Sequence, residues 1–264
     1  MALQFCSFAS GSSGNCYLVR SDETAILIDA GISGKRIFQG LSDTGTPMED
    51  VSALLVTHEH IDHVKSLPIV SKKLPNVFIY ANEATWGSIE RPVAEEKRRT
   101  FHTGCEFQIE DLTIRPFAIP HDAAEPVGFS IYHQDSQISI VTDVGHITDE
   151  IFEEIIDADL LLLEANHEEE ILLMGRYPYP VKRRILGEHG HLSNVNAGKC
   201  LGKLIRRSQK KRQVLLGHLS HENNDPSVAL LAVRNTLMEQ DIIPGNDLKL
   251  EVVLRDCCSC LYEV

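Results

Sequence analysis

Four side chains that commonly bind metals stand within six residues of one another in the segment LLVTHEHIDHV, directly after an apolar run. They are His58, His60, Asp62 and His63. Side chains two residues apart in an extended segment point to the same side, so His58 and His60 can bind one cation together. A helix that begins near residue 63 turns Asp62 and His63 toward a second, neighbouring cation. Imidazole and carboxylate ligands suit zinc, manganese or iron, and the segment therefore predicts a site for divalent metals.

Three more potential ligands each follow a short apolar run with the composition of a strand. They are His121 in FAIPHDA, Asp143 in SIVTDVG and His218 in VLLGHLSH. Strand ends that meet at one edge of a sheet form a rigid scaffold for a metal site. The seven groups together hold only two carboxylates, whereas two divalent ions carry four positive charges. The predicted site is therefore locally positive in a chain of net charge −13, and it attracts an anionic phosphodiester.

The elements that must position these groups are short strands and amphipathic helices. Apolar runs rich in β-branched and aromatic residues predict strands through the first half of the chain. Helices are expected at 33–41, 65–74, 147–157, 180–187, 195–207 and 226–239, and a closing pair of strands at 248–254 and 258–264. Strands alternate with helices, and no linker or repeat divides the chain. We therefore predict one layered α/β or α+β domain over residues 1–264.

The composition, with 43% hydrophobic and 24% charged residues, is that of a globular protein. Its acidic balance argues against binding a polyanion over the whole surface. No apolar run approaches the roughly 18 residues of a membrane helix, and the first residues lack a signal-peptide pattern, so a cytoplasmic location without a membrane partner is expected. Seven scattered cysteines predict reduced thiols. Cys257, Cys258 and Cys260 are expected to be buried in a terminal strand and not to bind zinc.

The HxHxDH pattern, present as HEHIDH, and the later His, Asp and His resemble the metallo-β-lactamase fold superfamily. The resemblance implies an α+β fold, an αββα sandwich of two packed mixed sheets flanked by helices, with two divalent metal ions at one edge. It assigns the first metal to His58, His60 and His121, the second to Asp62, His63 and His218, and makes Asp143 a ligand of both. Asp29 in ILIDAG matches an early aspartate that orients a ligand, with a turn-forming aspartate before Gly31 as the alternative.

Two further segments, LLLEANHEEE and GEHGHLSN, resemble the phosphodiesterase branch of this superfamily. His60 stands where the flavin-linked diiron reductases usually have Glu, which favours the hydrolytic branch. The resemblance implies that Glu164 orients His191 and that His191 protonates the leaving oxygen. A helix cap near Asn194 is the alternative for His191. The expected catalytic residues are Asp62, Glu164 and His191.

Within that branch the chain is similar to the WalJ (YycJ) group of compact bacterial DNA exonucleases. The shared segments are SGSSGNCYLV, TDVGHIT, EANHE, GHLSN and GHLSHENN. The resemblance implies a nucleic-acid substrate degraded from the 5′ end, through attack of a metal-bridging hydroxide on the phosphodiester. Too few residues separate His121 from Asp143, and Asp143 from His218, for the arm or the inserted domain of two other nuclease groups.

Substrate contacts are expected from polar and basic residues near these segments: Ser12, Ser13 and Asn15, Arg176, Lys182 and Arg183, and Ser193 and Asn194. The Gly-rich loop can present N–H groups to a phosphate, although turn formation alone also explains it. A second basic run over 206–212 is expected to be the exposed end of a helix.

Two other functions remain open on the sequence. One is a small-molecule hydrolase, such as a cyclic phosphodiesterase or lactonase, that uses the same two metals. The other is a regulatory or redox protein that binds metal without hydrolysis. The Glu164–His191 pair speaks against the latter, because a sensor needs no acid for a leaving group.

Overall fold

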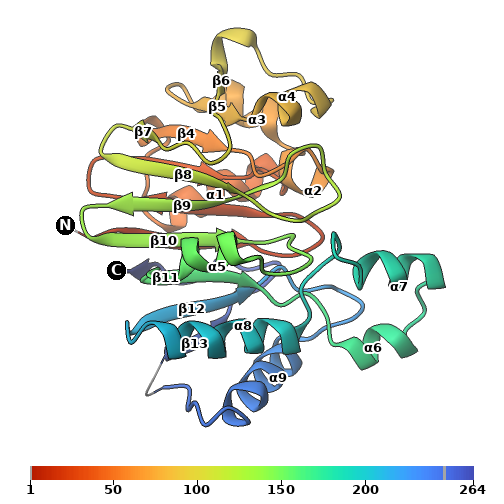
Figure 1. Cartoon of the computed structure of the whole chain (residues 1–264). Helices are drawn as coiled ribbons and strands as arrows, with labels where there is room; N and C mark the ends of the chain where they lie inside the picture. The colour runs from red at the N-terminus through yellow and green to blue at the C-terminus, as the bar shows by residue number, and fades with distance from the viewer. Residues whose placement is uncertain (1, 246–247) are drawn as a thin grey trace.

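The computed structural model describes residues 2–245 and 248–264, which form two seven-stranded mixed sheets packed face to face (Figure 1). The first sheet has the order β14-β1-β2-β3-β4-β5-β6. Its strands are β1 (Gln4–Ala9), β2 (Cys16–Arg20), β3 (Ala25–Ile28), β4 (Val51–Leu55), β5 (Phe78–Ala81), β6 (Arg98–Thr100) and β14 (Tyr262–Glu263). The second sheet has the order β13-β12-β11-β10-β9-β8-β7. Its strands are β7 (Phe107–Ile109), β8 (Leu112–Ala118), β9 (Val127–His133), β10 (Ser136–Val141), β11 (Leu160–Glu164), β12 (Arg212–Gly217) and β13 (Leu248–Val252).

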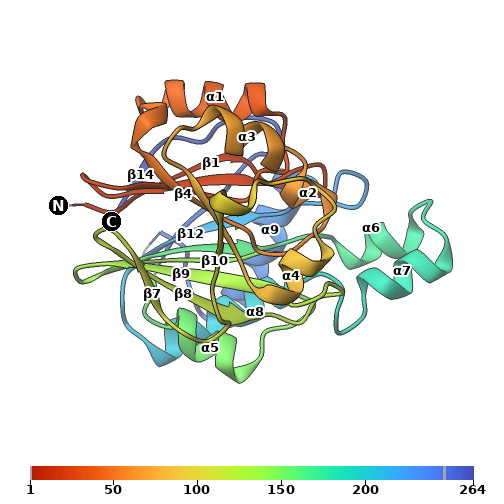
Figure 2. The ribbon, with the colours of Figure 1, turned by 90° about the horizontal axis from the view of Figure 1, so that it is seen from above.

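Helices cover the outer face of each sheet, so the α+β sandwich predicted from the sequence is confirmed (Figure 2). The first sheet is covered by α1 (Gly34–Asp43) and α3 (Leu67–Lys73), and the second by α5 (Asp149–Ile155), α8 (Asn194–Arg207) and α9 (Pro226–Met238). The remaining helices are α2 (Ile61–Val64), α4 (Glu83–Ser88), α6 (Glu169–Met174) and α7 (Tyr179–Ile185), with short 3-10 turns at Met48–Asp50 and Glu95–Lys97. In both views α6 and α7 project from one end of the sandwich.

Alternating side chains on each strand divide the core into three layers. In β3, Ile26 and Ile28 pack between the sheets, while Leu27 packs under the outer helices. In β11, Leu160 and Leu162 face the first sheet, and Leu161 and Leu163 pack against the helices of the second face. This period of two in fully apolar strands is expected of sheets buried on both faces.

The direction of the strands brings their carboxyl ends together. Strands β10, β11 and β12 are parallel to one another, and β3 is parallel to β4. The chain leaves these strands toward the end of the sandwich where α2, α6 and α7 lie (Figure 1). Residues that follow the parallel strands therefore gather at one edge of the molecule.

The predicted helices correspond to α1, α3, α5, α7, α8 and α9, and the turn into a helix near residue 63 to α2. The predicted closing strand pair is wrong. Strand β13 pairs in parallel with β12 and β14 pairs antiparallel with β1, because the chain crosses from one sheet to the other between them. The burial expected for Cys257, Cys258 and Cys260 is also wrong, since all three lie before β14 and are exposed.

Strand β11 was not among the segments expected from the sequence. Its LLLL run lacks the β-branched residues that favour strands, and leucine has a high helix propensity. Burial on both faces between β10 and β12 overrides that propensity.

No helix in the described ranges has the length and apolar character needed to cross a membrane.

Candidate metal centre

Three residues at the edge of the sandwich have left-handed backbone conformations: Asp29 (φ 60°), Asp143 (φ 57°) and His218 (φ 54°). Each comes within two residues of the end of a strand, where the chain must turn sharply. Asp and His tolerate this region better than most residues, but it persists only where surrounding contacts hold it. At His218 those contacts are the backbone N–H, which donates to Ser10 Oγ at 2.8 Å, and the carbonyl, which accepts from Asn166 at 2.9 Å.

The HEHIDH segment leaves β4 and enters α2, with His60 at the N-cap of that helix. Asn15 N donates to the carbonyl of Asp62 at 2.9 Å, which holds the Gly-rich loop against α2. A Cβ atom on Gly31 would lie 1.5 Å from the same carbonyl oxygen, so only glycine permits this approach. The loop, the end of β3 and α2 are therefore locked together around Asp62.

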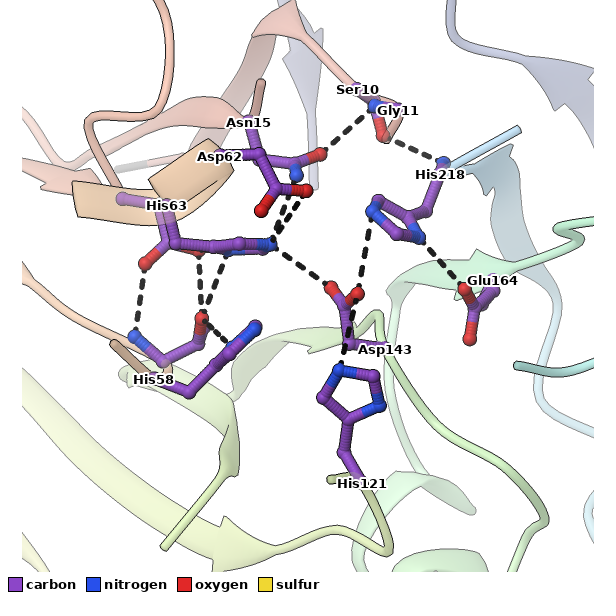
Figure 3. Close-up of polar contacts among 12 residues, drawn as sticks. Ser10, Gly11, Asn15, His58, Asp62, His63, His121, Asp143, Glu164 and His218 are labelled. Carbon is purple, nitrogen blue, oxygen red and sulfur yellow. Dashed lines mark hydrogen bonds and ion pairs between the residues drawn. The ribbon is translucent and has the colours of Figure 1, made fainter. Parts of the chain in front are cut away.

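Seven side chains that follow the ends of strands converge, and all but His60 are labelled in Figure 3. The ligand atoms of His58, His60 and His121 lie within 4.8 Å of one another, and so do those of Asp62, His63 and His218. Asp143 stands between the two groups. Its Oδ2 is 3.2 Å from His63 Nε2, and its Oδ1 is 3.4 Å from His218 Nε2 and 3.8 Å from His121 Nε2.

Four of these histidines are held through the same ring atom, Nδ1, which leaves Nε2 facing the centre. The partners are Asp29 Oδ2 for His63 (2.7 Å), Glu164 Oε1 for His218 (2.7 Å), the Gly190 carbonyl for His121 (3.2 Å) and Thr57 Oγ1 for His58 (3.0 Å). An imidazole that donates from Nδ1 to such a partner carries its lone pair on Nε2. Fixing the ring in this way is a common feature of metal-binding histidines.

The buried ring atoms at the centre fit a cation. In the part of the chain that the structure describes, His58 Nε2 and His218 Nε2 are buried without a hydrogen-bond partner. An unpaired buried polar atom costs about 1–3 kcal/mol, which a divalent ion at the same place relieves. This donor set of imidazoles and carboxylates is one that zinc, manganese and iron accept.

The electrostatics of the cluster also favour a cation. Burial, followed by the charge of His63, holds the pKa of His58 well below its usual range, so His58 stays neutral and able to bind a metal. Burial opposes ionisation of Asp143, but the charges of His218 and His63 outweigh it and hold the pKa of Asp143 well below its usual range. Burial opposes the charge of His63 and His218, but the charge of Asp29, followed by that of Asp143, raises the pKa of His63, and Asp143, followed by Glu164, raises the pKa of His218. A metal ion would replace those protons in the same negative field.

Glu164, fully buried at the end of β11, connects this cluster to His191. Its Oε1 accepts from His191 Nδ1 at 2.9 Å and from His218 Nδ1 at 2.7 Å. Its Oε2 accepts from the backbone N–H groups of Val144 at 2.7 Å and Leu192 at 3.3 Å. One carboxylate thus sets the orientation of a potential ligand, of His191 and of two loops.

The same carboxylate controls the charge of His191. Burial disfavours the imidazolium, but the adjacent Glu164 carboxylate outweighs burial and raises the pKa of His191 to about 9. Burial likewise opposes the charge of Glu164, yet the two histidines lower its pKa to about 2. Because Nδ1 of His191 is bonded to Glu164, its Nε2 is the ring atom left for a substrate. The His191 side chain is 17% exposed, so the ring is partly accessible from solvent.

Among the expected substrate contacts, Ser12 and Ser13 are exposed beside the centre, whereas Asn15 is buried. Asn15 Nδ2 lies 3.1 Å from His63 Nε2, and its Oδ1 accepts from Gly11 N at 2.9 Å. Ser193 caps α8, and its hydroxyl donates to Glu169 at 2.8 Å. The buried Asn194 amide donates to Glu168 at 3.0 Å. Asn15, Ser193 and Asn194 therefore use their polar atoms within the protein.

Two of the three expected basic contacts also have partners in the protein. Arg176 pairs with Glu222 at 3.0 Å. Lys182 Nζ donates to the carbonyls of Leu173 and Gly175 at 2.7 and 2.6 Å, which joins α7 to the end of α6. Arg183 is exposed.

Two contributors to the site were not anticipated from the sequence. Thr57, whose signal is its place directly before HEHIDH, bonds both Asp29 and His58. Asp122, beside His121, is held by Arg184 from α7 at 3.0 Å, and no local pattern in the sequence indicates that pairing.

Comparison with known proteins gives consistent results at three levels. A family model described as "Beta-lactamase superfamily domain" matches residues 24–219. The chain is 35% identical to a Bacillus anthracis protein named exodeoxyribonuclease YycJ, over 91% of each chain. It is 34% identical to exodeoxyribonuclease WalJ of Streptococcus pneumoniae, over 100% of this chain and 99% of that one. The metallo-β-lactamase fold protein YhfI of Bacillus subtilis superposes over both full chains with a TM-score of 0.75 at 15% identity.

Proposed function

The chain belongs to the β-lactamase superfamily, close to its WalJ and YycJ proteins, and we propose that it is a two-metal phosphodiesterase that degrades DNA from the 5′ end. The observation that carries the proposal is the buried Glu164 carboxylate, which bonds both His218 in the metal centre and His191 beside it. A proton donor is thereby fixed next to the place where cations would hold a phosphate. The full-length similarity to two proteins named as exodeoxyribonucleases supports DNA as the substrate.

We assign the candidate ligands to two ions from the distances between their ligand atoms and from the resemblance. His58, His60 and His121 would hold one, Asp62, His63 and His218 the other, and Asp143 would contact both. Zinc, manganese or iron ions at these places supply Lewis acidity toward phosphoryl oxygens and lower the pKa of water. Asp29 and Thr57 hold His63 and His58 in the orientation that this binding needs.

The protein's own part in the reaction is to place and transfer protons. His191 donates the proton on Nε2 to the departing oxygen of the DNA, while Glu164 stabilises the imidazolium through Nδ1. Asp62, whose side chain is 22% exposed, accepts a hydrogen bond from the attacking water and orients it. The exposed Ser12 and Ser13 hydroxyls and Arg183 contact neighbouring phosphates. Seven free cysteines support a cytoplasmic location, where thiols stay reduced.

A nuclease assay with end-labelled DNA tests the proposal. Duplex DNA labelled at the 5′ or 3′ end, single-stranded DNA, RNA and bis-p-nitrophenyl phosphate are incubated with the protein and Zn²⁺ or Mn²⁺. The expected result is metal-dependent release of the 5′ label as nucleotide before the 3′ label, which EDTA and Asp143→Asn abolish. Asp22→Asn, the same change at an exposed position, serves as the matched control.

Two outcomes contradict the proposal. Cleavage of the small ester without degradation of any DNA would assign the site to a small-molecule hydrolase. Early release of the 3′ label alone would overturn the 5′ polarity and leave the assignment as a DNA exonuclease standing.

A further inference from the structure

A groove of about 700 Å³ lies between α5 and α8, on the outer face of the second sheet. Figure 1 shows the two helices side by side there. Both walls begin at the metal centre, because α5 follows Asp143 along the chain and α8 follows His191. His191 Nδ1 lies 3.8 Å from Asp143 Oδ1, so the two walls start from adjacent side chains. His146 and Leu192 line the end of the groove nearest the centre.

The α8 wall carries a line of four cations, Lys199, Lys203, Arg206 and Arg207, which we call the basic stripe. Lys199 precedes Lys203 by four residues, and Arg206 and Arg207 follow Lys203 by three and four, which places all of them along one side of the helix. All four are exposed. Arg206 donates to the Gln240 carbonyl at 3.2 Å, and Arg207 pairs with Glu153 of α5 at 3.2 Å. Within the described ranges, Lys199 and Lys203 have no ion-pair partner.

The remainder of the groove is partly apolar and partly polar, and besides two acidic groups its polar lining comes from His146, Thr148, Asn196 and Gln240. Ile147, Phe152, Leu192 and Cys200 contribute the apolar surface, and Asp149 and Glu153 the carboxylates. The four cations of the basic stripe exceed the two carboxylates in number. The groove is therefore a locally positive channel in a chain of net charge −13, with apolar surface for sugars or bases.

The neighbouring cations of the same basic run are used differently. Lys210 pairs with Asp159 at 2.8 Å, and the buried Arg212 donates to the Ile156 carbonyl at 2.9 Å. The prediction of an exposed helix end over 206–212 is therefore correct for Arg206 and Arg207, which line the groove, and wrong for Arg212, which is buried. Lys210 is half-buried and Arg212 is buried in these contacts, whereas all four cations of the basic stripe are exposed, so the basic stripe is the part of the run that can contact a polyanion.

We propose that this groove binds the backbone of the DNA strand whose end lies in the metal centre, with the basic stripe contacting its phosphates. The inference rests on the proposed function and specifies where the substrate extends. A 14-residue helix is about 21 Å long, and a strand rises about 3.4 Å per nucleotide, so α8 spans about six nucleotides. The groove thus binds substrate that the metal centre does not touch.

Charge reversal on the basic stripe tests this. Lys199→Glu/Lys203→Glu is compared with the wild type in binding a fluorescent, phosphorothioate-linked DNA strand, and in hydrolysing DNA, a dinucleotide and bis-p-nitrophenyl phosphate. We expect DNA binding to weaken about tenfold or more at 0.1 M salt, and the slope of log affinity against log salt to fall by about 1.5. Hydrolysis of the dinucleotide and the ester should stay within twofold, because neither reaches the groove.

Two variants control for charge and folding. Lys199→Arg/Lys203→Arg keeps the charges and should bind DNA as the wild type does. Lys72→Glu/Lys73→Glu makes the same charge reversal on exposed residues of α3, on the outer face of the first sheet, and should change DNA affinity little.

The outcomes separate this inference from the proposed function. If the Lys199→Glu/Lys203→Glu variant still degrades DNA and keeps the DNA affinity and salt slope of the wild type, DNA does not bind in the groove, and the proposed nuclease activity stands. If the wild type cleaves only the ester but the variant binds DNA more weakly, DNA binding in the groove is supported and the proposed nuclease activity is refuted. Equal weakening by the α3 control would show a general charge effect and overturn the groove.

Discussion

Replacing Glu164 with glutamine keeps the shape of the side chain but removes its charge and one of its two acceptor oxygens. The carboxylate accepts from four donors, His191 and His218 on one oxygen and the backbone of Val144 and Leu192 on the other. The glutamine amide has one acceptor oxygen and a donating NH₂ group. If its oxygen faces the histidines, two backbone N–H groups lose their acceptor. If its oxygen faces the backbone, both imidazoles lose theirs.

Either orientation leaves two of four buried hydrogen bonds unmade. An unsatisfied buried donor costs about 1–3 kcal/mol, and the 3.3 Å bond to Leu192 belongs at the low end of that range, so the variant should lose about 2–4 kcal/mol of unfolding free energy. If the glutamine oxygen faces the backbone, His218 also loses the acceptor that keeps its lone pair on Nε2, and if it faces the histidines, His218 keeps only an uncharged acceptor. Loss of such a partner typically weakens metal binding about 10–100-fold.

Urea denaturation in EDTA measures the first effect without metal, and calorimetric titration with Zn²⁺ measures the second. Glu170→Gln is the matched control, because Glu170 is an exposed residue of α6 in the same segment and should change neither quantity. A Glu164→Gln protein that unfolds and binds zinc like the wild type would refute the role assigned to this carboxylate.

His191→Asn, whose amide can still donate to Glu164, should slow DNA hydrolysis about 10²–10⁴-fold, since the departing oxygen then lacks its proton donor. Hydrolysis of bis-p-nitrophenyl phosphate should slow far less, because p-nitrophenolate leaves without a proton. An equal loss of rate on both substrates in steady-state assays would contradict the role of His191 as a proton donor. Gly31→Ala places a Cβ atom against the Asp62 carbonyl and should destabilise the protein by about 1–3 kcal/mol or more in thermal melts. Gly87→Ala, in α4 with open space around the added Cβ, should leave the stability unchanged or raise it. Equal melting temperatures for the two variants would contradict the claim that Gly31 is needed for the close approach to the Asp62 carbonyl.

Much of the candidate site was readable because its signals are local. The HEHIDH spacing and the runs before His121, Asp143 and His218 predicted groups at strand ends, and the parallel strands bring those groups to one edge. Short apolar runs rich in β-branched and aromatic residues predicted most strands for the same reason, since strand propensity depends on the residue types within the run.

Other features depended on contacts between distant parts of the chain. The resemblance implied the pairing of Glu164 with His191. Nothing near Glu164 in the sequence indicates that the same carboxylate also bonds His218 and the backbone of two loops, because its partners come from three separate segments. The pairing of β13 and β14 in different sheets was also missed, since register and partner are set by packing over the whole sandwich.

The order of residue types along the chain is enough to indicate the candidate ligands, because metal-binding chemistry belongs to individual side chains and their spacing. Whether a charged side chain is available to a substrate is different, because a carboxylate or carbonyl far away in the chain decides it. Arg212 is bonded inside the protein while Lys199 faces an open groove, and the two residues look alike in the sequence. Folding alone brings together the distant groups that neutralise one cation and leave the other exposed.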